Sequence, residues 1–497
     1  MPINFLAMKK LLFFLFYLCI SISYAQITTP GTGTRFTFSD FVSDTTCTVT
    51  SPEAGVFILT QDLTVSDNDT LWLDAATHSL TIEGAVSITI FGCVQCEERD
   101  NPLEINGIAI DSSNTLFEWR FEEAASSVLK NVKMMSGESI FINQSNVSIQ
   151  FCEFTNFNAQ VIRYMNCNPI ILHCNFHDNR QAAINSGLNV TGSPIICYNQ
   201  FYHNVLNNLN QPQINLGPGV NGRDIIIEGN TIEGCSPLSG GIAIANLMNI
   251  GPTQAVIRSN IIENNRYGYT QQGTDIYAII EDNQFINNNL EENPMNGGSG
   301  ISIYGSDTTC AAKLRRNVIS GNFWGITAIN QHTIDMGTAD DFGQNRLFDN
   351  ENGGQTYALY NNASSSMTAI GNYWGGNTEE FVESVIFHRP DLGDNYGLVL
   401  YTPILTEDTA YIYDNKEITF TVYPNPTNGI VNVELNPAFG SLASEIQLFD
   451  IYGRQLQVLT IKDERIQIDL TQYATGIYLV KLVQGDKVVA MKKVVKN

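Results

Sequence analysis

The sequence predicts an all-β protein in which a long parallel β-helix is followed by a small C-terminal β-sandwich. A four-column repeat that fills the middle of the chain predicts the β-helix, since no helical 3.6-residue pattern occupies the gaps between repeats. Short alternating segments after residue 417 predict the sandwich. Of the 497 residues, 43% are hydrophobic and 15% are charged, so the chain has enough apolar material for a large core.

The repeat consists of an apolar residue, an Asn three positions later, a large apolar residue two positions after that, and a second Asn. The first ladder position holds Cys152, Cys174, Asn199, Asn230, Asn260, Asn283, Asn317, Asn345 and Asn372. Three residues earlier stand Ile149, Ile171, Ile196, Ile227, Ile257, Ile280, Leu314, Phe342 and Ala369. Two residues later stand Phe154, Phe176, Phe201, Ile232, Ile262, Phe285, Ile319, Leu347 and Trp374. Five residues later stand Phe157, Asn179, Asn204, Cys235, Asn265, Asn288, Asn322, Asn350 and Asn377.

The repeats are unequal in length, with ladder positions 22 to 34 residues apart, yet all four columns persist. This combination indicates coils stacked ~4.8 Å apart, in which like residues form columns and loops absorb the extra length. Earlier segments (56–65, 70–73, 80–82 and 105–110) are interpreted as less regular coils of the same solenoid.

The Asn-rich pattern covers roughly residues 50–400 and resembles the right-handed parallel β-helix repeat proteins. That superfamily includes pectate-lyase-like enzymes and many adhesins, so the resemblance implies a fold and leaves the function open. We expect the solenoid to span 26–402 and to end in an amphipathic helical cap at 377–388, with Asn377 as its N-cap and Glu380 at its third position. Trp324 and Trp374 are interpreted as core or cap residues.

The first 25 residues predict an export signal. Lys9 and Lys10 precede an apolar run, 11–22, and Ser23-Tyr24-Ala25 supplies small residues for cleavage, so the mature chain would begin near Gln26. No later segment has the length of apolar sequence that a membrane span requires.

Residues 403–417 are rich in Pro, Asp and Thr and predict a linker, followed by a sandwich over 418–497. Within 418–497, Tyr423-Pro424-Asn425-Pro426-Thr427-Asn428-Gly429, Asp450-Ile451-Tyr452-Gly453-Arg454, Tyr473-Ala474-Thr475-Gly476-Ile477-Tyr478-Leu479 and the basic tail 492–496 stand in order. These motifs closely resemble the C-terminal sorting domain of type IX secretion. The resemblance implies recognition by the type IX secretion machinery, passage across the outer membrane, removal of the domain, and release or attachment at the cell surface.

The charge balance excludes nucleic acid as a partner. The whole chain carries a net charge of -24, and residues 26–415 hold 15 basic and 42 acidic residues, a net charge of -27. A field of this sign repels phosphate backbones and anionic lipid surfaces.

The cysteines and acidic loops offer candidate disulfide and metal sites. Cys152 and Cys174 lie one rung apart in one column, which is compatible with either a disulfide or two buried thiols. Cys93 and Cys96 have redox-motif spacing without the matching fold, so we expect a staple to Cys47 or a free pair. Ca²⁺ is the candidate metal, and its candidate ligands are Asp335, Asp340 and Asp341, with 67–69 as a second loop, although neither has an EF-hand pattern.

One cluster of ionisable residues is a candidate catalytic site. Adjacent rungs would bring together His177, Asp178, Tyr202, His203 and Glu233. Tyr and His suit the base and acid of a polysaccharide lyase, and Asp178 with Glu233 suits the carboxylate pair of a hydrolase. A polar turn that faces water explains the same residues. A second column, Glu228, Arg258, Glu281 and Arg315, alternates in sign and is interpreted as outward ion pairs.

Two functions are therefore compatible with the sequence. The first is a non-enzymatic, exported or cell-surface protein that binds a glycan or another surface partner, as adhesins do. The second is a polysaccharide lyase or glycoside hydrolase centred on the His177–Glu233 patch. A deep groove over that patch would favour the enzyme, and a flat flank would favour binding.

Overall fold

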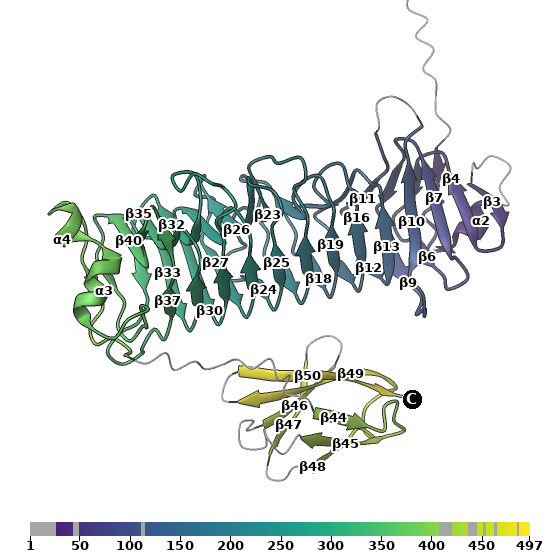
Figure 1. Cartoon of the computed structure of the whole chain (residues 1–497). Helices are drawn as coiled ribbons and strands as arrows, with labels where there is room; N and C mark the ends of the chain where they lie inside the picture. The colour runs from purple at the N-terminus through teal and green to yellow at the C-terminus, as the bar shows by residue number, and fades with distance from the viewer. Residues whose placement is uncertain are drawn as a thin grey trace, which may run out of the picture. The chain divides into compact units, whose positions relative to one another are not determined.

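The structure is a computed structural model that describes residues 26–42, 49–110, 115–406, 420–435, 445–450, 454–461, 465–484 and 487–497. The chain divides into two compact units, Met1–Asp408 and Thr409–Asn497. The predicted signal peptide, most of the predicted linker, Cys47 and the motif residues 451–453 lie outside the described residues. The first unit is a stack of coils, each contributing a strand to three long sheets in turn (Figure 1).

Sheet 1 collects one strand from each coil, and its neighbouring strands pair in parallel. Its strands, in order, are β1 (Ile27–Thr28), β5 (Leu63–Val65), β8 (Ser87–Ile90), β11 (Glu118–Glu122), β14 (Ser139–Asn143), β17 (Ile162–Met165), β20 (Ile184–Ser186), β23 (Gln211–Leu216), β26 (Ser239–Asn246), β29 (Tyr269–Gly273), β32 (Ser299–Gly305), β35 (Trp324–Asn330), β40 (Leu359–Ala363) and β42 (Ile386–Phe387).

Sheets 2 and 3 collect the next two strands of each coil. Sheet 2 contains β12 (Ser127–Lys130), β15 (Val147–Gln150), β18 (Ile170–Leu172), β21 (Ile195–Cys197), β24 (Asp224–Glu228), β27 (Thr253–Arg258), β30 (Ile276–Glu281), β33 (Cys310–Arg315), β36 (Thr333–Asp335), β41 (Met367–Thr368) and β43 (Val399–Leu400). Sheet 3 contains β3 (Val49–Glu53), β4 (Val56–Leu59), β7 (Ser79–Glu83), β10 (Leu103–Ile108), β13 (Val132–Met135), β16 (Glu153–Thr155), β19 (Asn175–His177), β22 (Gln200–Tyr202), β25 (Thr231–Glu233), β28 (Ile261–Glu263), β31 (Gln284–Ile286), β34 (Val318–Ser320) and β37 (Arg346–Phe348).

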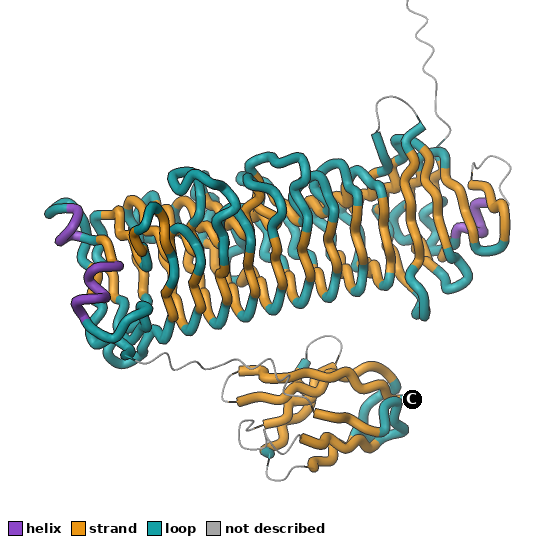
Figure 2. The backbone as a smooth tube through the Cα atoms, viewed as in Figure 1, coloured by secondary structure: helices purple, strands orange, loops and turns teal. Residues whose placement is uncertain are grey.

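Smaller elements complete the first unit. They are the sheet of β2 (Arg35–Phe36), β6 (Thr70–Leu73) and β9 (Cys93–Cys96), the pair β38 (Glu351–Asn352) and β39 (Gln355–Thr356), and the helices α2 (Phe38–Val42), α3 (Glu379–Val385) and α4 (Arg389–Leu392). Figure 2 shows loops of different lengths leaving the stack between strands that keep their register. This is the expected behaviour of a solenoid in which each coil contacts only its neighbours.

The core consists of the predicted apolar columns. In sheet 2, Ile149, Ile171 and Ile196 are register partners on successive strands. In sheet 3, the rings of Phe154 and Phe176 stack with centroids 5.0 Å apart, and Phe176 stacks on Phe201 at the same distance. These side chains are fully buried, so the rung spacing itself brings aromatic faces into contact.

The first asparagine ladder is continuous from rung to rung. The Asn283 Oδ1 accepts hydrogen bonds from the backbone N–H and the side-chain amide of Asn260, at 3.0 and 2.9 Å. The Asn283 amide in turn donates to Asn317 Oδ1 and to the Ile257 carbonyl, at 3.0 and 2.9 Å. The same pairing links Asn199, Asn230, Asn260, Asn283, Asn317, Asn345 and Asn372. Each amide therefore satisfies a backbone N–H that the corner would otherwise leave buried and unpaired.

The second ladder contains an interruption that the structure bridges. Cys235 is exposed, and the buried side chain of Gln213 takes its place. Gln213 accepts from the Asn204 amide at 2.9 Å and donates to Asn265 Oδ1 at 3.1 Å. The amide connection thus continues through a residue of sheet 1 that is distant from the repeat motif in the sequence.

Two column assignments from the sequence are wrong. Phe342 is 39% exposed, and the buried Met336 occupies its predicted place next to Ala369, because residues 337–343 loop out after Asp335. Asn377 is exposed and does not join the second ladder. The cap of α3 is Thr378, whose side chain accepts from the Phe381 N–H, so the helix begins one residue later than predicted.

The second unit consists of antiparallel strands, as predicted. One sheet contains β44 (Phe420–Tyr423), β45 (Ile430–Leu435) and β48 (Arg465–Asp469); the other contains β47 (Gln455–Thr460), β46 (Glu445–Asp450), β49 (Gly476–Gln484) and β50 (Lys487–Lys496). Inward residues of both sheets, such as Val431, Ile468, Leu448 and Val480, form a separate core.

Replacing a ladder amide should destabilise the solenoid strongly. Asn283→Ala would leave the buried Asn260 N–H without its acceptor, so we expect the free energy of unfolding of the full chain to fall by about 2–4 kcal/mol. The measurement is chemical denaturation followed by circular dichroism. Asn221→Ala, at an exposed turn position, is the matched control and should change stability by less than about 0.5 kcal/mol. Equal effects of the two substitutions would contradict a structural role for the ladder.

Candidate functional site

The predicted catalytic residues lie together at the end of sheet 3 strands. His177, Tyr202 and Glu233 are register partners in one outward column of β19, β22 and β25. Asp178 and His203 directly follow two of these strands, with φ of 54° and 52°. Asp, Asn and His tolerate this left-handed conformation better than most residues, so the corner itself favours these residue types.

His177 is held between two carboxylates. Its Nδ1 lies 2.7 Å from Asp178 Oδ2, and its Nε2 lies 3.2 Å from Glu153 Oε1. Its ring stacks on Tyr202 with centroids 4.9 Å apart and planes 3° apart. His203 Nδ1 lies 3.5 Å from the other oxygen of Asp178. Both imidazole nitrogens of His177 are therefore engaged within the cluster.

Lys133 extends this network on the neighbouring rung. Its Nζ lies 2.8 Å from Glu153 Oε1. Burial opposes ionisation of Glu153, but hydrogen bonds from Lys133 and His177 outweigh it and lower the pKa of Glu153. The hydrogen bond to Glu153 raises the pKa of Lys133. Lys133, Glu153, His177 and Asp178 thus form a connected polar network along the outer surface of sheet 3.

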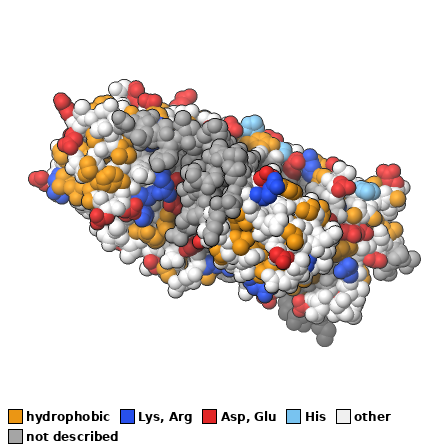
Figure 3. Space-filling model, turned by 90° about the horizontal axis from the view of Figure 1, so that it is seen from below, with side chains coloured by type: hydrophobic (Ala, Val, Ile, Leu, Met, Phe, Trp, Pro, Cys, Tyr) orange, Lys and Arg blue, Asp and Glu red, His pale blue; other side chains and the backbone are white. Residues whose placement is uncertain are grey.

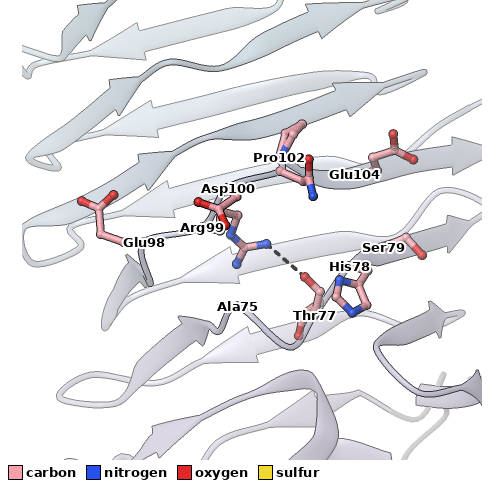
Figure 4. Close-up of a pocket in the computed structure, with 10 residues that line it drawn as sticks. Ala75, Thr77, His78, Ser79, Glu98, Arg99, Asp100, Pro102 and Glu104 are labelled. Atoms are coloured by element: carbon pink, nitrogen blue, oxygen red, sulfur yellow. Dashed lines mark hydrogen bonds between the residues drawn. The ribbon is translucent and has the colours of Figure 1, made fainter.

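Two surface hollows of the described residues lie at other places. A hollow of about 710 Å³ is lined by His78, Arg99, Asp100 and Glu104, among others (Figure 4). Arg99 there donates to the carbonyls of Leu73, Asp74 and Thr77, at 2.7, 2.7 and 3.0 Å. Its guanidinium therefore ties backbone segments together. A second hollow, of about 440 Å³, is lined by Ser306, Asn330, Gln331, Asn362, Ala363, Ser364, Asn395 and Tyr396. Neither hollow includes a residue of the His177 patch.

The candidate calcium ligands take part in ion pairs and backbone contacts. Asp341 Oδ2 lies 2.9 Å from Arg315 and 2.8 Å from Lys313, and Asp335 lies 2.7 Å from Arg315. Asp340 is exposed. In the second loop, the Asp69 carboxylate accepts the backbone N–H groups of Gly31 and Thr34, at 2.7 and 2.9 Å. Within the described ranges, no group of three or more His, Cys, Asp or Glu side chains is arranged to hold a metal ion.

The column of alternating sign is only partly an outward ion-pair column. Arg258 pairs with Glu228 at 2.8 Å, as predicted. Arg315 is instead 2% exposed and turns to Asp335 and Asp341, while Arg316 pairs with Glu281 at 2.8 Å. The interpretation of Arg315 as surface decoration is therefore wrong, since its guanidinium also donates to the Leu314 and Asp335 carbonyls.

The described cysteines are free thiols. Cys152 and Cys174 are buried and donate to the carbonyls of Gln150 and Leu172, both at 3.2 Å, so the buried-thiol alternative describes them. Cys93 and Cys96 form a free pair, and burial raises the pKa of Cys96 to about 11. A thiol with a raised pKa is a poor nucleophile, which disfavours redox chemistry at this pair.

The outer face of sheet 1 is a feature that the repeat motif did not identify. Between Arg163 and Tyr360, one outward column carries only uncharged side chains, here called the neutral stretch: Asn185, Asn215, Ala243, Thr270, Ser302 and Thr327. The first five are partly exposed, whereas Thr327 is buried with its hydroxyl 3.0 Å from that of Ser299. The Asn215 amide donates to Asn185 Oδ1 at 2.8 Å. The sequence signal that could have revealed this face is the alternation of buried and part-exposed residues in the strand that precedes each repeat motif.

Four aromatic residues gather at one end of the neutral stretch. They are Trp324, Tyr357, Tyr360 and Phe387, here called the aromatic cluster, and each is partly exposed. Trp324 lies 4.5 Å from Tyr357 and 5.4 Å from Tyr360, and Tyr357 lies 4.7 Å from Phe387, between ring centroids. The interpretation of Trp374 as the end of a core column is confirmed at 1% exposure, whereas Trp324 belongs to the outer face.

A fixed loop borders this face. Residues 288–298 connect β31 to β32 and lie against the aromatic cluster, because Trp324 Nε1 donates to the Pro294 carbonyl at 2.8 Å. Arg266 holds the same loop through the Asn296 carbonyl, at 2.8 Å from its Nε, and also donates to Asn210. The space-filling view in Figure 3, which shows the molecule from below, has hydrophobic side chains gathered in patches and acidic side chains scattered among them.

Comparison with protein families identifies two regions. A secretion system C-terminal sorting domain matches residues 421–497, and a family of unknown function, DUF1565, matches residues 226–379. No curated protein matches the chain.

Solved structures give similar folds at low identity. The periplasmic alginate epimerase AlgG is 11% identical, with a TM-score of 0.46, over 75% of this chain and 84% of the other. The receptor-binding tailspike of bacteriophage Det7 is 9% identical, with a TM-score of 0.26, over 93% of this chain and 88% of the other.

The sheet topology defines the class of the first unit, a parallel β-helix, and residues 226–379 of this unit match the DUF1565 family. The chain carries a type IX secretion C-terminal sorting domain, which indicates recognition by that machinery and export to the cell surface or the extracellular space. Within the part of the chain that the structure describes, helices are too short or too polar to cross a membrane.

The ion pairs around Arg315 predict a pH-dependent contribution to stability. Hydrogen bonds from Arg315 and Lys313 lower the pKa of Asp341 to about 2, from an ordinary value near 3.8. A lowered pKa stabilises the fold above the unfolded-state pKa, and the stabilisation disappears as pH falls from about 4 towards 2. We expect Asp341→Asn to destabilise the chain at pH 7 by less than about 1 kcal/mol, because the carboxylate is half exposed.

The measurement is denaturant unfolding of wild type and variant at several pH values. The difference between them should shrink below pH 4, and Asp340→Asn, at the exposed neighbouring position, should show no such trend. A difference that stays constant down to pH 2 would contradict the assignment.

Proposed function

We propose that the chain is an exported surface or extracellular protein that binds polysaccharide along the outer face of sheet 1, without cleaving it. The observation that carries the proposal is the continuity of the neutral stretch with the aromatic cluster. Hydroxyl and amide groups can donate hydrogen bonds to sugar hydroxyls and accept hydrogen bonds from them. Aromatic rings offer apolar surface to the C–H faces of sugars.

The arrangement along the solenoid supports binding of an extended chain. Register pairing repeats a partly exposed outward position on every rung, from Asn185 on β20 to Ser302 on β32. With rungs ~4.8 Å apart, these five positions span roughly 19 Å. A linear polymer laid along this axis meets similar groups at regular intervals, so many weak contacts add up.

The composition of this column supports binding rather than catalysis. General acid–base chemistry requires titratable groups within hydrogen-bond reach of the reacting atoms. The neutral stretch consists of Asn, Ala, Thr and Ser, which do not titrate near neutral pH. Export by the type IX route is compatible with a surface adhesin or a released glycan-binding protein.

A second candidate function is a polysaccharide lyase or hydrolase that uses the His177 patch. The observation that favours it is the proximity of His177, Asp178, Tyr202 and His203 on adjacent rungs. The engagement of both His177 nitrogens by carboxylates favours binding instead. Ca²⁺ at Asp335, Asp340 and Asp341 stays a prediction for either function.

Removing one ring of the aromatic cluster should weaken binding. We expect Tyr360→Ala to reduce the affinity of the full chain for its preferred polysaccharide by about tenfold, because ring contacts contribute about 1 kcal/mol or more each. The measurement is isothermal titration calorimetry after a screen of neutral and acidic polysaccharides. Tyr198→Ala removes a 44% exposed tyrosine from a different corner and should leave the affinity unchanged. Equal losses in both variants would count against the sheet 1 face.

Substitutions in the His177 patch distinguish the two functions. We expect wild type, Asp178→Ala and His203→Ala to bind the same polysaccharide with affinities within about twofold, since the patch lies on another sheet. The assay also records new reducing ends and unsaturated ends. Cleavage by wild type that both substitutions abolish would establish the enzyme and refute the non-enzymatic proposal; cleavage that neither affects would place catalysis elsewhere.

A further inference from the structure

We infer that the polysaccharide bound by the sheet 1 face is an uncharged chain rather than a polyuronate. This inference rests on the proposed function and specifies its ligand class. Three independent features of the described residues support it: the absence of charge in the neutral stretch, the pairing of the nearby cations, and the negative field of the solenoid.

The neutral stretch has no group that could neutralise a carboxylate. Thr270 and Ser302 are register partners in its centre, and both side chains are partly exposed. A uronate bound there would lose water around its carboxylate without gaining an opposite charge, which is costly. A neutral sugar loses only hydroxyl hydration, which hydroxyl and amide groups replace.

The arginines beside the neutral stretch already form ion pairs with carboxylates. Arg120 pairs with Glu118 at 2.7 Å and with Glu122 at 2.5 Å, and Arg163 lies 3.9 Å from Glu118. Both guanidinium groups also lie over the ring of Phe141, at 4.6 and 5.3 Å from its centroid. Recruiting either arginine to a ligand carboxylate would disrupt these contacts.

The lysines of the solenoid are likewise paired with carboxylates. Lys130 pairs with Glu98, Lys133 with Glu153, and Lys313 with Asp341. They are the three lysines of residues 26–415, which carry a net charge of -27. The negative field of the solenoid therefore repels a polyanion at long range. At contact, each of these lysines already has a carboxylate partner and does not offset the repulsion.

The aromatic cluster supplies the specificity that charge does not. Tyr360 and Phe387 are register partners in the same outward column as the neutral stretch, so their rings continue its line. The flanking loop at 288–298 is held by Arg266 and Trp324, so this end of the face is preorganised. A preorganised surface loses little conformational entropy on binding.

The test compares neutral and acidic chains on the same protein. The full chain is titrated calorimetrically with xylan, mannan and linear β-glucan oligosaccharides, and with alginate and polygalacturonate oligosaccharides of similar length. We expect at least about tenfold tighter binding of one neutral chain than of either uronate chain. This binding should not change between low and high ionic strength, because salt screens charge interactions and leaves neutral contacts intact.

A bulky substitution locates the binding. Thr270→Trp or Ser302→Trp would fill the centre of the neutral stretch and should reduce neutral-chain binding at least about tenfold. Thr231→Trp makes the same change at a partly exposed position of sheet 3 and should leave binding unchanged. The unfolding transition of each variant shows whether the substitution destabilises the fold. If one sheet 1 variant does not fold, the binding measurement on the other sheet 1 variant decides whether this face binds the chain.

The outcomes separate the ligand class from the proposed function. Preferential binding of a uronate chain that Thr270→Trp abolishes would overturn the inference and leave binding at this face intact. If both sheet 1 substitutions leave neutral-chain binding unchanged, the sheet 1 face is not the binding site, and the inference is wrong. Failure of every chain to bind would overturn the proposed function itself.

Discussion

The whole structure depends on the satisfaction of buried backbone groups at the corners between strands. A coil that turns three times must bury N–H groups where no strand neighbour can accept them. The asparagine ladder solves this with one side chain per rung, since each Oδ1 accepts both a backbone N–H and the amide of the preceding rung. Because these amides both donate and accept, the rungs from Asn199 to Asn372 are linked along the axis. The stacking of Phe and Ile columns follows from the same spacing.

The interruption at Cys235 shows which part of this device is essential. The motif position there has lost its amide, yet Gln213 supplies one from β23 and contacts Asn204 and Asn265 on either side. It also donates to the Glu233 carbonyl at 2.8 Å. The requirement is therefore an amide at that point in space, whichever strand provides it. Cys152 and Cys174 extend the argument, since their thiols donate only to carbonyls and the first ladder begins with Asn199.

The repeated columns could be predicted from the sequence, whereas the positions at which the repeat is interrupted could not. The columns through Ile171, Phe176 and Asn283 could be found because stacking forces the same residue type onto successive rungs. Phe342 and Asn377 were misplaced because a loop and a helix cap break the fixed spacing at the last coils. The proximity of His177, Asp178, Tyr202 and His203 could be predicted because these residues lie at constant offsets from the ladder. The contact of His177 with Glu153, and that of Glu153 with Lys133, come from two earlier rungs. A position in the repeat does not show which neighbouring side chain a ring nitrogen will contact.

The outer faces of the three sheets differ in charge, which supports different roles for these faces. Sheets 2 and 3 carry outward ion pairs such as Glu228–Arg258 and Lys133–Glu153, and such exposed pairs contribute little stability. Sheet 1 departs from this pattern between Arg163 and Tyr360, although its strands have the same geometry. An identical backbone with a different surface indicates that side-chain chemistry, and not the fold, distinguishes this face. The binding function is therefore proposed there.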